Sequence, residues 1–222
     1  MRITAVLVCA ALSGCVVIPE PTDRDARILA IGDSILAWNR GVGASVPDAI
    51  EARLGEAVVD ASVAGAKMRE SGLRASIGFS IPDQYRSGDW DAVVLNGGGN
   101  DLNGTCGCDG CDAVLNRLVR EDYPALLARL GDTQVFILGY YGAAGDRFGN
   151  FDTCEDELLT LERRLTRLAA TRPNVTLVAI RDAITGKPAL YDDDRIHPSP
   201  AGSAVIGDLV ARALVANIGP AR

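Results

Sequence analysis

The sequence is short of positive charge and of histidine. Its 222 residues include 22 lysines and arginines against 29 aspartates and glutamates, a net charge of −7, and a single histidine. An acidic chain repels the phosphates of nucleic acid, so we expect no nucleic-acid partner. Because histidine is the side chain suited to accept a proton near neutral pH, any serine-histidine mechanism in this chain has to use His197.

The sequence also lacks an internal repeat and any sign of a second domain. Hydrophobic residues make up 48% and charged residues 23%, a composition typical of globular proteins and not of disordered ones. The length is enough for one domain with a substantial core. We place this domain at residues 27–218.

The N-terminus has the pattern of a bacterial lipoprotein signal. An apolar stretch over residues 3–12 runs into the sequence Leu-Ser-Gly-Cys, which ends at Cys15. This segment resembles a lipobox, in which the cysteine is lipidated and begins the mature chain; an ordinary signal peptide that contains a cysteine is the alternative. We expect a signal peptide at residues 1–14, a tether at residues 15–26, and a lipid on Cys15. The lipid would anchor the protein to a membrane of the bacterial cell envelope, on the periplasmic side or in the outer membrane.

Apolar runs of β type alternate with amphipathic stretches along the rest of the chain. This alternation indicates βαβ units and therefore an α/β fold with a parallel sheet. The runs are continuous, as in strands that are covered on both faces. The expected strands are residues 27–31, 57–61, 92–96, 134–140 and 175–180. The expected helices are residues 46–54, 112–130, 154–171 and 201–217, the second broken or kinked before Pro124.

Ligands of such sheets bind at the carboxyl ends of the strands, and a serine follows the first expected strand there, in Gly32-Asp33-Ser34. A serine at a strand-to-helix turn can present its hydroxyl as a nucleophile and its own N–H to a substrate oxygen. The alternative is an ordinary loop or helix cap. The segment lacks the second glycine of a Gly-x-Ser-x-Gly elbow, which argues against the α/β-hydrolase fold.

Two further glycine-containing segments follow the second and third expected strands. Gly65 lies in the first, where a glycine lets a backbone N–H approach a ligand closely. The second contains three successive glycines and then Asn100, whose side-chain amide is suited to donate to a developing oxyanion. A simple turn at Gly65 and an Asx-type hydrogen bond at Asn100 are the alternatives.

The only histidine stands three residues after Asp194. In a turn, this carboxylate can fix the tautomer of His197 and stabilise its imidazolium form. Asp192 and Asp193 compete by proximity, but the spacing favours Asp194. The alternative is a histidine with a purely structural role.

The order of these segments resembles the four sequence blocks of the SGNH (GDSL-type) hydrolase family, over about residues 27–217. The resemblance implies a flavodoxin-like three-layer α/β/α sandwich with a five-stranded, mostly parallel sheet. It implies a serine esterase with Ser34, Asp194 and His197 as catalytic triad, and with Ser34, Gly65 and Asn100 as oxyanion hole. No metal or organic cofactor is implied, and the substrate would be a small-molecule, lipid or glycan ester.

Two other functions are compatible with the same segments. A cell-envelope acyltransferase or polysaccharide O-deacetylase would use the same site. A non-catalytic envelope-binding lipoprotein would keep only the scaffold, and the complete set of Ser34, Asp194 and His197 argues against it. We expect the protein to be a monomer.

Four cysteines follow the N-terminal segment, namely Cys106, Cys108, Cys111 and Cys154. An even number in an exported protein predicts two disulfides, whereas a zinc site is the alternative. A bridge between Cys106 and Cys108 would be strained, so one cysteine of the cluster is expected to join Cys154. Such bridges would hold the loop that carries Asn100.

Aromatic residues near the expected strand ends are candidates for a substrate pocket. Tyr140 and Tyr141 follow the fourth expected strand, and Trp38 lies one helical turn after Ser34. Packing at the rim of the sheet is the alternative for all three.

Overall fold

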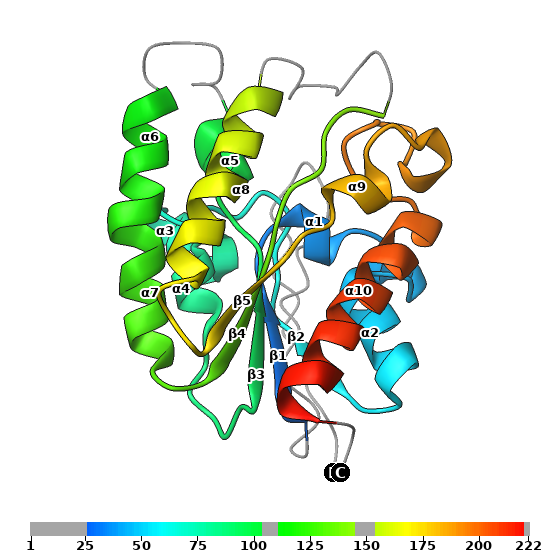
Figure 1. Ribbon diagram of the computed structural model, residues 1–222, viewed down its shortest axis with the longest axis horizontal. Helices are drawn as coiled ribbons and strands as arrows, with labels where there is room; N and C mark the ends of the chain where they lie inside the picture. Colours follow the sequence, from blue (N-terminus) through cyan, green and yellow to red (C-terminus); the bar gives the residue numbers. More distant parts are fainter. Residues whose placement is uncertain (1–25, 104–110, 145–153, 220–222) are drawn as a thin grey trace.

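A sheet of five parallel strands runs through the computed structural model, in which residues 26–103, 111–144 and 154–219 are described (Figure 1). The strand order is β2-β1-β3-β4-β5. The strands are β1 (Ile28–Ile31), β2 (Val58–Asp60), β3 (Ala92–Leu95), β4 (Gln134–Leu138) and β5 (Val175–Val178). Each lies within the range expected from the sequence, and the predicted fold class is confirmed.

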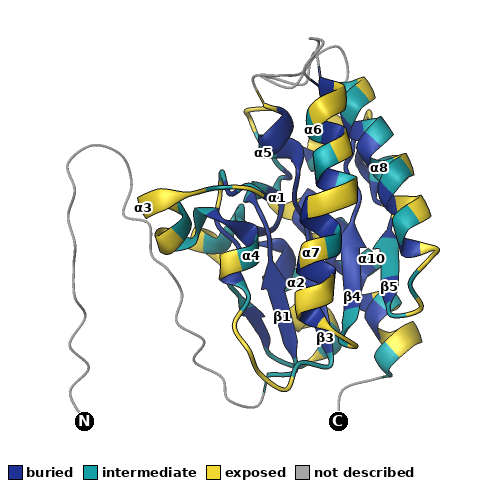
Figure 2. Cartoon of the chain, turned by 90° about the vertical axis from the view of Figure 1, so that its left-hand side faces the viewer, coloured by how far each residue is buried: buried dark blue, intermediate teal, exposed yellow. Residues whose placement is uncertain are grey.

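Helices cover both faces of the sheet and complete a three-layer sandwich (Figure 1). One layer holds α1 (Ser34–Ala37), α2 (Val46–Leu54), α9 (Arg181–Ile184) and α10 (Pro200–Ile218). The other holds α3 (Gly72–Arg74), α4 (Ile81–Gln84), α5 (Gly99–Leu102), α6 (Cys111–Arg117), α7 (Tyr123–Leu130) and α8 (Glu155–Ala169). Short 3-10 helices occur at Arg40–Val42 and Pro188–Leu190. Figure 2 shows the strands buried between helices whose outer faces are exposed.

The continuous apolar runs follow from this layering. Every residue of β1 and β3 is fully buried, because side chains on both faces of a central strand pack against helices. Ile28 of β1 aligns with Val58 of β2 on one side and with Ala92 of β3 on the other. The three strands therefore end at nearly the same level, and the loops that follow them meet.

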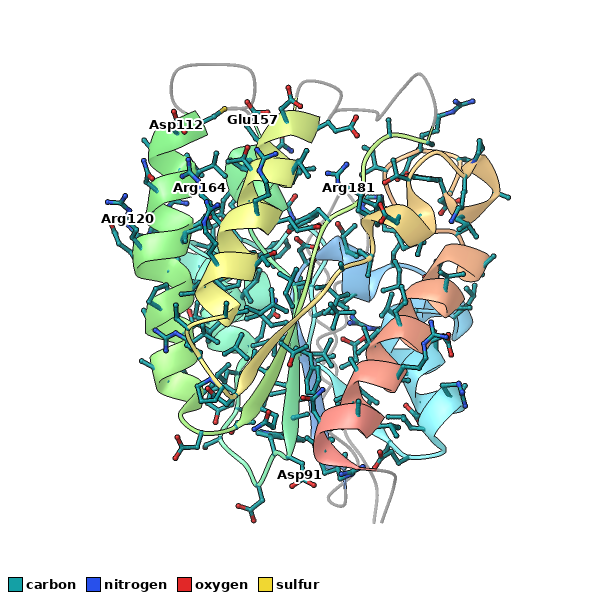
Figure 3. The ribbon with its side chains drawn as sticks, in the orientation of Figure 1. Asp91, Asp112, Arg120, Glu157, Arg164 and Arg181 are labelled. Atoms are coloured by element: carbon teal, nitrogen blue, oxygen red, sulfur yellow. The ribbon has the colours of Figure 1, made fainter. Side chains whose placement is uncertain are left out.

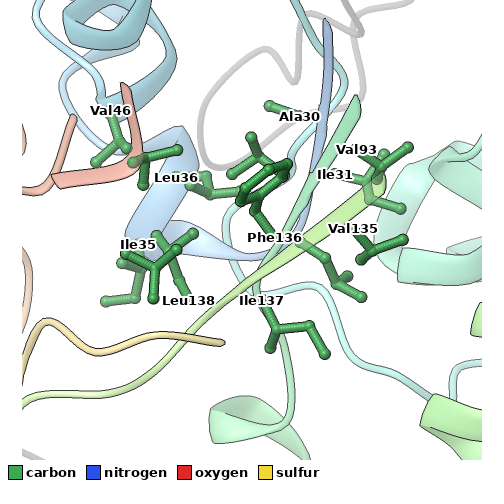
Figure 4. Close-up of a cluster of buried hydrophobic side chains, with 14 of the residues drawn as sticks. Ala30, Ile31, Ile35, Leu36, Val46, Val93, Val135, Phe136, Ile137 and Leu138 are labelled. Carbon is green, nitrogen blue, oxygen red and sulfur yellow. The ribbon is translucent and has the colours of Figure 1, made fainter. Parts of the chain in front are cut away.

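The core beneath these loops anchors the first helix (Figure 4). Ile35 and Leu36 of α1 are buried, together with Phe136 of β4 and Val46 of α2. A four-residue helix has little stability of its own. Burial of these side chains therefore fixes the position of α1 and of Ser34, its first residue.

The helix predicted over residues 112–130 is continuous but irregular in the turn before Pro124, where the sequence predicts a break or kink. A π-helical turn at Leu118–Asp122 joins α6 to α7 and ends just before Pro124. A proline inside a helix removes one backbone donor and crowds the preceding turn. A wider turn accommodates both effects.

Within the described residues, only α10 is long and apolar enough to cross a membrane by length and composition. Ile206, Val210 and Leu214 of this helix are buried, and Gly207 allows close approach to α2, since a Cβ there would lie 2.5 Å from that of Ala49. Its apolar character is therefore explained by packing inside the domain.

The N-terminal predictions lie outside the described residues. They concern the signal peptide at residues 1–14, the tether that begins at residue 15, and the lipid on Cys15. The domain boundaries likewise stay a prediction.

Candidate active site

The loops after β1, β2 and β3 contact one another at the carboxyl edge of the sheet. The amide of Val63 donates to the carbonyl of Gly32 at 3.0 Å. The side-chain amide of Asn100 donates to the carbonyl of Ala66, also at 3.0 Å. Three segments that are far apart in the sequence, those of Ser34, Gly65 and Asn100, are thus brought to one place.

Ser34 is half-buried at the start of α1, and the residues around it are firmly held. Asp33 caps the helix, with its carboxylate accepting the amide of Ile35 at 2.9 Å. The buried side chain of Gln84 accepts the amide of Gly32 at 2.6 Å and donates to its carbonyl at 3.0 Å. Gly32 is required here, since a Cβ would lie 2.7 Å from the carbonyl oxygen of Asn96.

Two glycines, Gly65 and Gly98, set the backbone conformation around the candidate oxyanion donors. Gly65 has a φ of +81°, a conformation that glycine adopts without strain. Gly98 has a φ of +109°, and a Cβ there would lie 2.9 Å from Leu161. Asn100 follows this turn and uses one of its side-chain N–H groups on Ala66. An asparagine amide carries a second N–H, which is suited to donate to an oxyanion.

An ion network of two buried carboxylates and two partly exposed arginines holds the loop of Asn100. Asp101 accepts the amide of Met68 at 2.8 Å and the guanidinium of Arg117 at 2.8 Å. Arg117 also binds Asp122 at 2.9 Å, and Arg69 joins Asp122 as well. Burial raises the pKa of Asp101, and the hydrogen bond from Met68 and the charge of Arg117 oppose this effect. The network ties the Gly65 loop to α5.

The structure pairs the histidine with Asp194. Nδ1 of His197 lies 2.5 Å from Oδ2 of Asp194, and Oδ1 accepts the amides of Ile196 and His197, each at 2.9 Å. Partial burial raises the pKa of Asp194, but these hydrogen bonds outweigh it and hold the pKa below its usual range. This arrangement leaves Nε2 of His197 as the nitrogen that can exchange a proton with a substrate or a nucleophile.

Trp38 stacks on the imidazole of His197. The ring centroids are 3.7 Å apart and the planes differ by 8°. The indole N–H donates to Asp192 at 2.6 Å, so this aspartate, a competitor of Asp194 by proximity, supports the tryptophan instead. Trp38 is four residues after Ser34 and lies on the same side of the chain at α1. The stack therefore brings His197 to the side of α1 that carries Ser34.

The two candidate tyrosines lie beneath the site, with their hydroxyls used internally. Tyr140 is 5% and Tyr141 1% exposed. The hydroxyl of Tyr141 donates to the carbonyl of Ile196, next to His197, at 2.8 Å. That of Tyr140 donates to Asp33 at 3.0 Å. Both therefore act on the position of the site from within the core, and a part in a substrate pocket stays a prediction.

Sequence reasoning missed Gln84, Arg117 and the interaction of Asp192 with Trp38. Gln84 and Arg117 lie in ordinary helical segments, and nothing local marks them as partners of Gly32 and Asp101. The one available signal for Gln84 is that it is a polar residue on an otherwise apolar face of its helix.

Of the cysteine cluster, Cys106 and Cys108 lie outside the described residues. Cys111 and Cys154 are both buried, at the starts of α6 and α8, two helices that pack together. The predicted disulfides stay a prediction. In the described part of the chain, no group of three histidine, cysteine, aspartate or glutamate side chains is arranged to hold a metal ion.

Two cavities lie away from the residues described above. One, of about 470 Å³, lies between α8 and the π-helical turn after α6, and Arg167 is among its lining residues. Two further lining residues, Arg120 and Arg164, are labelled in Figure 3. The other, of about 580 Å³, is bordered by Asp48, Glu51 and Glu56. Neither is lined by a residue of the candidate site.

Comparison with known proteins gives a family and a fold. The sequence model of the GDSL-like lipase/acylhydrolase family matches residues 30–205. No curated protein matches the sequence. Among solved structures, a lipase/acylhydrolase from Enterococcus faecalis shares 21% identity, with 88% of this chain and 98% of that chain covered and a TM-score of 0.62. Est24, a carbohydrate acetylesterase from Sinorhizobium meliloti, shares 15% (85% and 98% covered, TM-score 0.62). The acetyl xylan esterase AlAXEase shares 19% (84% and 98% covered, TM-score 0.60). At these identities the solved structures show a common fold.

Proposed function

Because this chain belongs to the GDSL-like lipase/acylhydrolase family, we propose that it hydrolyses carboxylic esters with Ser34 as nucleophile. His197 is the general base and Asp194 its partner. The observation that carries this proposal is the pairing of the only histidine with Asp194, on a ring that stacks on Trp38, the C-cap of the helix that begins at Ser34.

The first step forms an acyl-enzyme. Oγ of Ser34 attacks the ester carbonyl while its proton passes to Nε2 of His197, and Asp194 stabilises the imidazolium that results. The backbone amides of Ser34 and Gly65 and the side-chain amide of Asn100 donate to the oxyanion. The intermediate then collapses, the ester C–O bond breaks, and the leaving alcohol takes the proton from His197.

The second step releases the acid. Water attacks the acyl-enzyme and gives its proton to His197. The intermediate then collapses, the bond between the acyl carbon and Oγ of Ser34 breaks, and Oγ takes the proton from His197, which releases the carboxylic acid and free Ser34. No hydrogen bond joins Ser34 to His197 among the described residues. Such contacts often tighten only when a substrate is bound.

O-acetylated glycans are the substrate class that we favour. Est24 and AlAXEase, which share the fold, are described as esterases of acetylated carbohydrates. Transfer of the acyl group to a second hydroxyl, in place of water, would use the same acyl-enzyme. A screen of acetylated sugars, short-chain esters and lysophospholipids, with a free sugar as competing acceptor, separates these activities.

We also propose that the enzyme is exported and anchored by a lipid on Cys15. The signal-like segment and the lipobox pattern support this proposal. Metabolic labelling with an alkyne fatty acid should mark the wild-type chain and leave Cys15→Ser unlabelled. Equal labelling of both would contradict the anchor.

Replacement of the nucleophile tests the mechanism. We expect Ser34→Ala to lose at least about 10³-fold in hydrolysis of p-nitrophenyl acetate and to lose labelling by a fluorophosphonate. Ser71→Ala is the matched control, because Ser71 is exposed, and it should keep full activity. Hydrolysis retained by Ser34→Ala would overturn the mechanism, and a wild-type chain that is neither active nor labelled would favour a non-catalytic binding protein.

A further inference from the structure

One buried hydroxyl connects the two loops that carry the proposed nucleophile and the proposed oxyanion donor. Tyr140 donates to Oδ2 of Asp33 at 3.0 Å and accepts the amide of Gly99 at 2.8 Å. Asp33 immediately precedes Ser34, and Gly99 immediately precedes Asn100. The hydroxyl thus touches the chain one residue away from each proposed reacting group.

We propose that Tyr140 is a positioning residue that sets the separation between Ser34 and Asn100. This inference rests on the proposed function. The tyrosine comes from neither of the two loops but from the segment directly after β4. It therefore supplies a common reference point to both.

The ring of Tyr140 is itself held in place. Its backbone amide donates to Glu162 of α8 at 3.0 Å, and the side chain is 5% exposed. A Cβ on Gly99 would lie 3.0 Å from the ring, so the glycine lets the backbone of α5 rest directly on it. Movement of either loop relative to Tyr140 would break a hydrogen bond or this packing.

Removal of the hydroxyl leaves one buried group without its partner and weakens another. In Tyr140→Phe, the amide of Gly99 loses its acceptor, and Oδ2 of Asp33 loses one donor but keeps Asn96 in its satisfied amide orientation. A buried polar group left unsatisfied costs about 1–3 kcal/mol, and the loops can relieve that cost only by moving apart or admitting water. Either response lets Asn100 shift relative to Ser34, and a displacement of about 1 Å is enough to slow a preorganised reaction.

Asp33 gives the tyrosine a second, electrostatic effect. Burial raises the pKa of Asp33 to about 6, while the hydrogen bonds from Ile35 and Tyr140 and the charge of His197 lower it. Other groups that face Asp33 are Asp101, Tyr123, Tyr141 and, in its satisfied amide orientation, Asn96. Loss of the Tyr140 hydroxyl raises this pKa further, so Asp33 takes up a proton at a higher pH. A neutral Asp33 no longer stabilises the imidazolium of His197.

The test compares Tyr140→Phe with Tyr191→Phe. The second variant also loses one buried hydroxyl, which donates to the carbonyl of Gly142 at 2.6 Å and touches neither Asp33 nor Gly99. We expect Tyr140→Phe to lower kcat about 10-fold with KM within about twofold, and to move the acid limb of the kcat profile to higher pH. Tyr191→Phe should keep the wild-type kcat and pH profile.

A double-mutant cycle separates positioning from a purely structural role. If Tyr140 acts through Asn100, the kcat effect of Tyr140→Phe should largely vanish in an Asn100→Ala background. A folded Tyr140→Phe with wild-type kcat and pH profile, or effects that multiply fully in the cycle, would overturn the inference. Ser34→Ala in the same assay keeps the two failures distinct, because an active Ser34→Ala refutes the proposed function, whereas an inactive one leaves only the role of Tyr140 in question.

Discussion

The two halves of the candidate site are built in opposite ways. The strand-end half, residues 32–34 and 97–101, is held by buried partners from distant parts of the chain, such as Gln84 and Tyr140. The histidine loop, residues 192–198, makes most of its hydrogen bonds within itself, and Trp38, Asn39 and Tyr141 add one each from outside. The amide of Asp192 donates to the carbonyl of His197, and Asp194 accepts amides two and three residues away.

The two halves also differ in how deeply their carboxylates are buried. Asp33 is 2% exposed, whereas the side chain of Asp194 is 35% exposed. The charge of a buried carboxylate such as Asp33 affects the free energy of unfolding, whereas the charge of a partly exposed one such as Asp194 is largely screened by water. We therefore expect changes in the strand-end half to alter folding and activity together, and changes in the histidine loop to alter activity alone.

The largest expected effect comes from the histidine loop. Replacement of His197 by alanine should lower kcat/KM by at least about 10³-fold, with the midpoint of thermal unfolding nearly unchanged because the loop is held locally. Asp193→Asn is the matched control, since this exposed neighbour of Asp194 does not contact the ring, and it should be fully active. A large loss of stability in His197→Ala would break the comparison between the halves.

The second effect is a pH dependence of stability in the strand-end half. Because burial raises the pKa of Asp33 from 3.8 to about 6, the folded state binds this proton more tightly than the unfolded state. Ionisation of Asp33 therefore lowers the free energy of unfolding as pH rises from about 4 to about 6, by about 3 kcal/mol in total. Asn at this position keeps an oxygen that can cap α1 and carries no charge.

Urea unfolding of wild type and Asp33→Asn at several pH values measures this effect. We expect the variant to gain stability relative to the wild type as pH rises from 4 to 7. A difference that does not change with pH would show that the Asp33 carboxyl has an ordinary pKa.

The third effect concerns Gly98. An alanine there would adopt a φ of +109° and approach Leu161 to 2.9 Å, so we expect a loss of about 2 kcal/mol in unfolding free energy together with reduced activity. Gly55→Ala is the control, because Gly55 has a φ of +72° with open space around it. It should cost about 1 kcal/mol and leave kcat unchanged. Equal effects on kcat would show that the glycine turn does not govern the site.

The smallest effect is expected from Trp38, whose ring stacks on His197 and whose backbone amide donates to the carbonyl of Ser34 at 2.9 Å. Its face stabilises a positively charged ring by about 1 kcal/mol, so Trp38→Leu should lower kcat about fivefold and Trp38→Phe less. Trp90→Leu serves as control, because Trp90 donates to Arg86 and belongs to neither half. A loss equal to that of His197→Ala would mean that Trp38 also positions His197.

The histidine loop and the strands were predictable from the sequence because their determinants are local. Continuous apolar runs correctly located β1 to β5 and, with them, the level at which the loops meet. The pairing of His197 with Asp194 follows from a spacing of three residues, and the structure brings these two side chains together. The proline at position 124 likewise marked the irregular turn in front of α7.

The partners of the strand-end half were not predictable, because their contacts join residues that are remote in the sequence. Gln84 lies 52 residues from Gly32, and Tyr140 lies 107 residues from Asp33. A sequence pattern reports which face of an element is buried, but not which distant polar group it meets there. Tyr140 and Trp38 were expected only as candidates for a substrate pocket.

The sequence by itself therefore determined the parallel sheet, the identity of the only histidine, and the segments that gather at the strand ends. Each of these depends on residue type or on near neighbours. The tertiary structure alone decided which buried groups hold Ser34 and Asn100 in register. The physical reason is that each buried polar group needs a hydrogen-bond partner, and the packing of the core decides which polar group comes within reach.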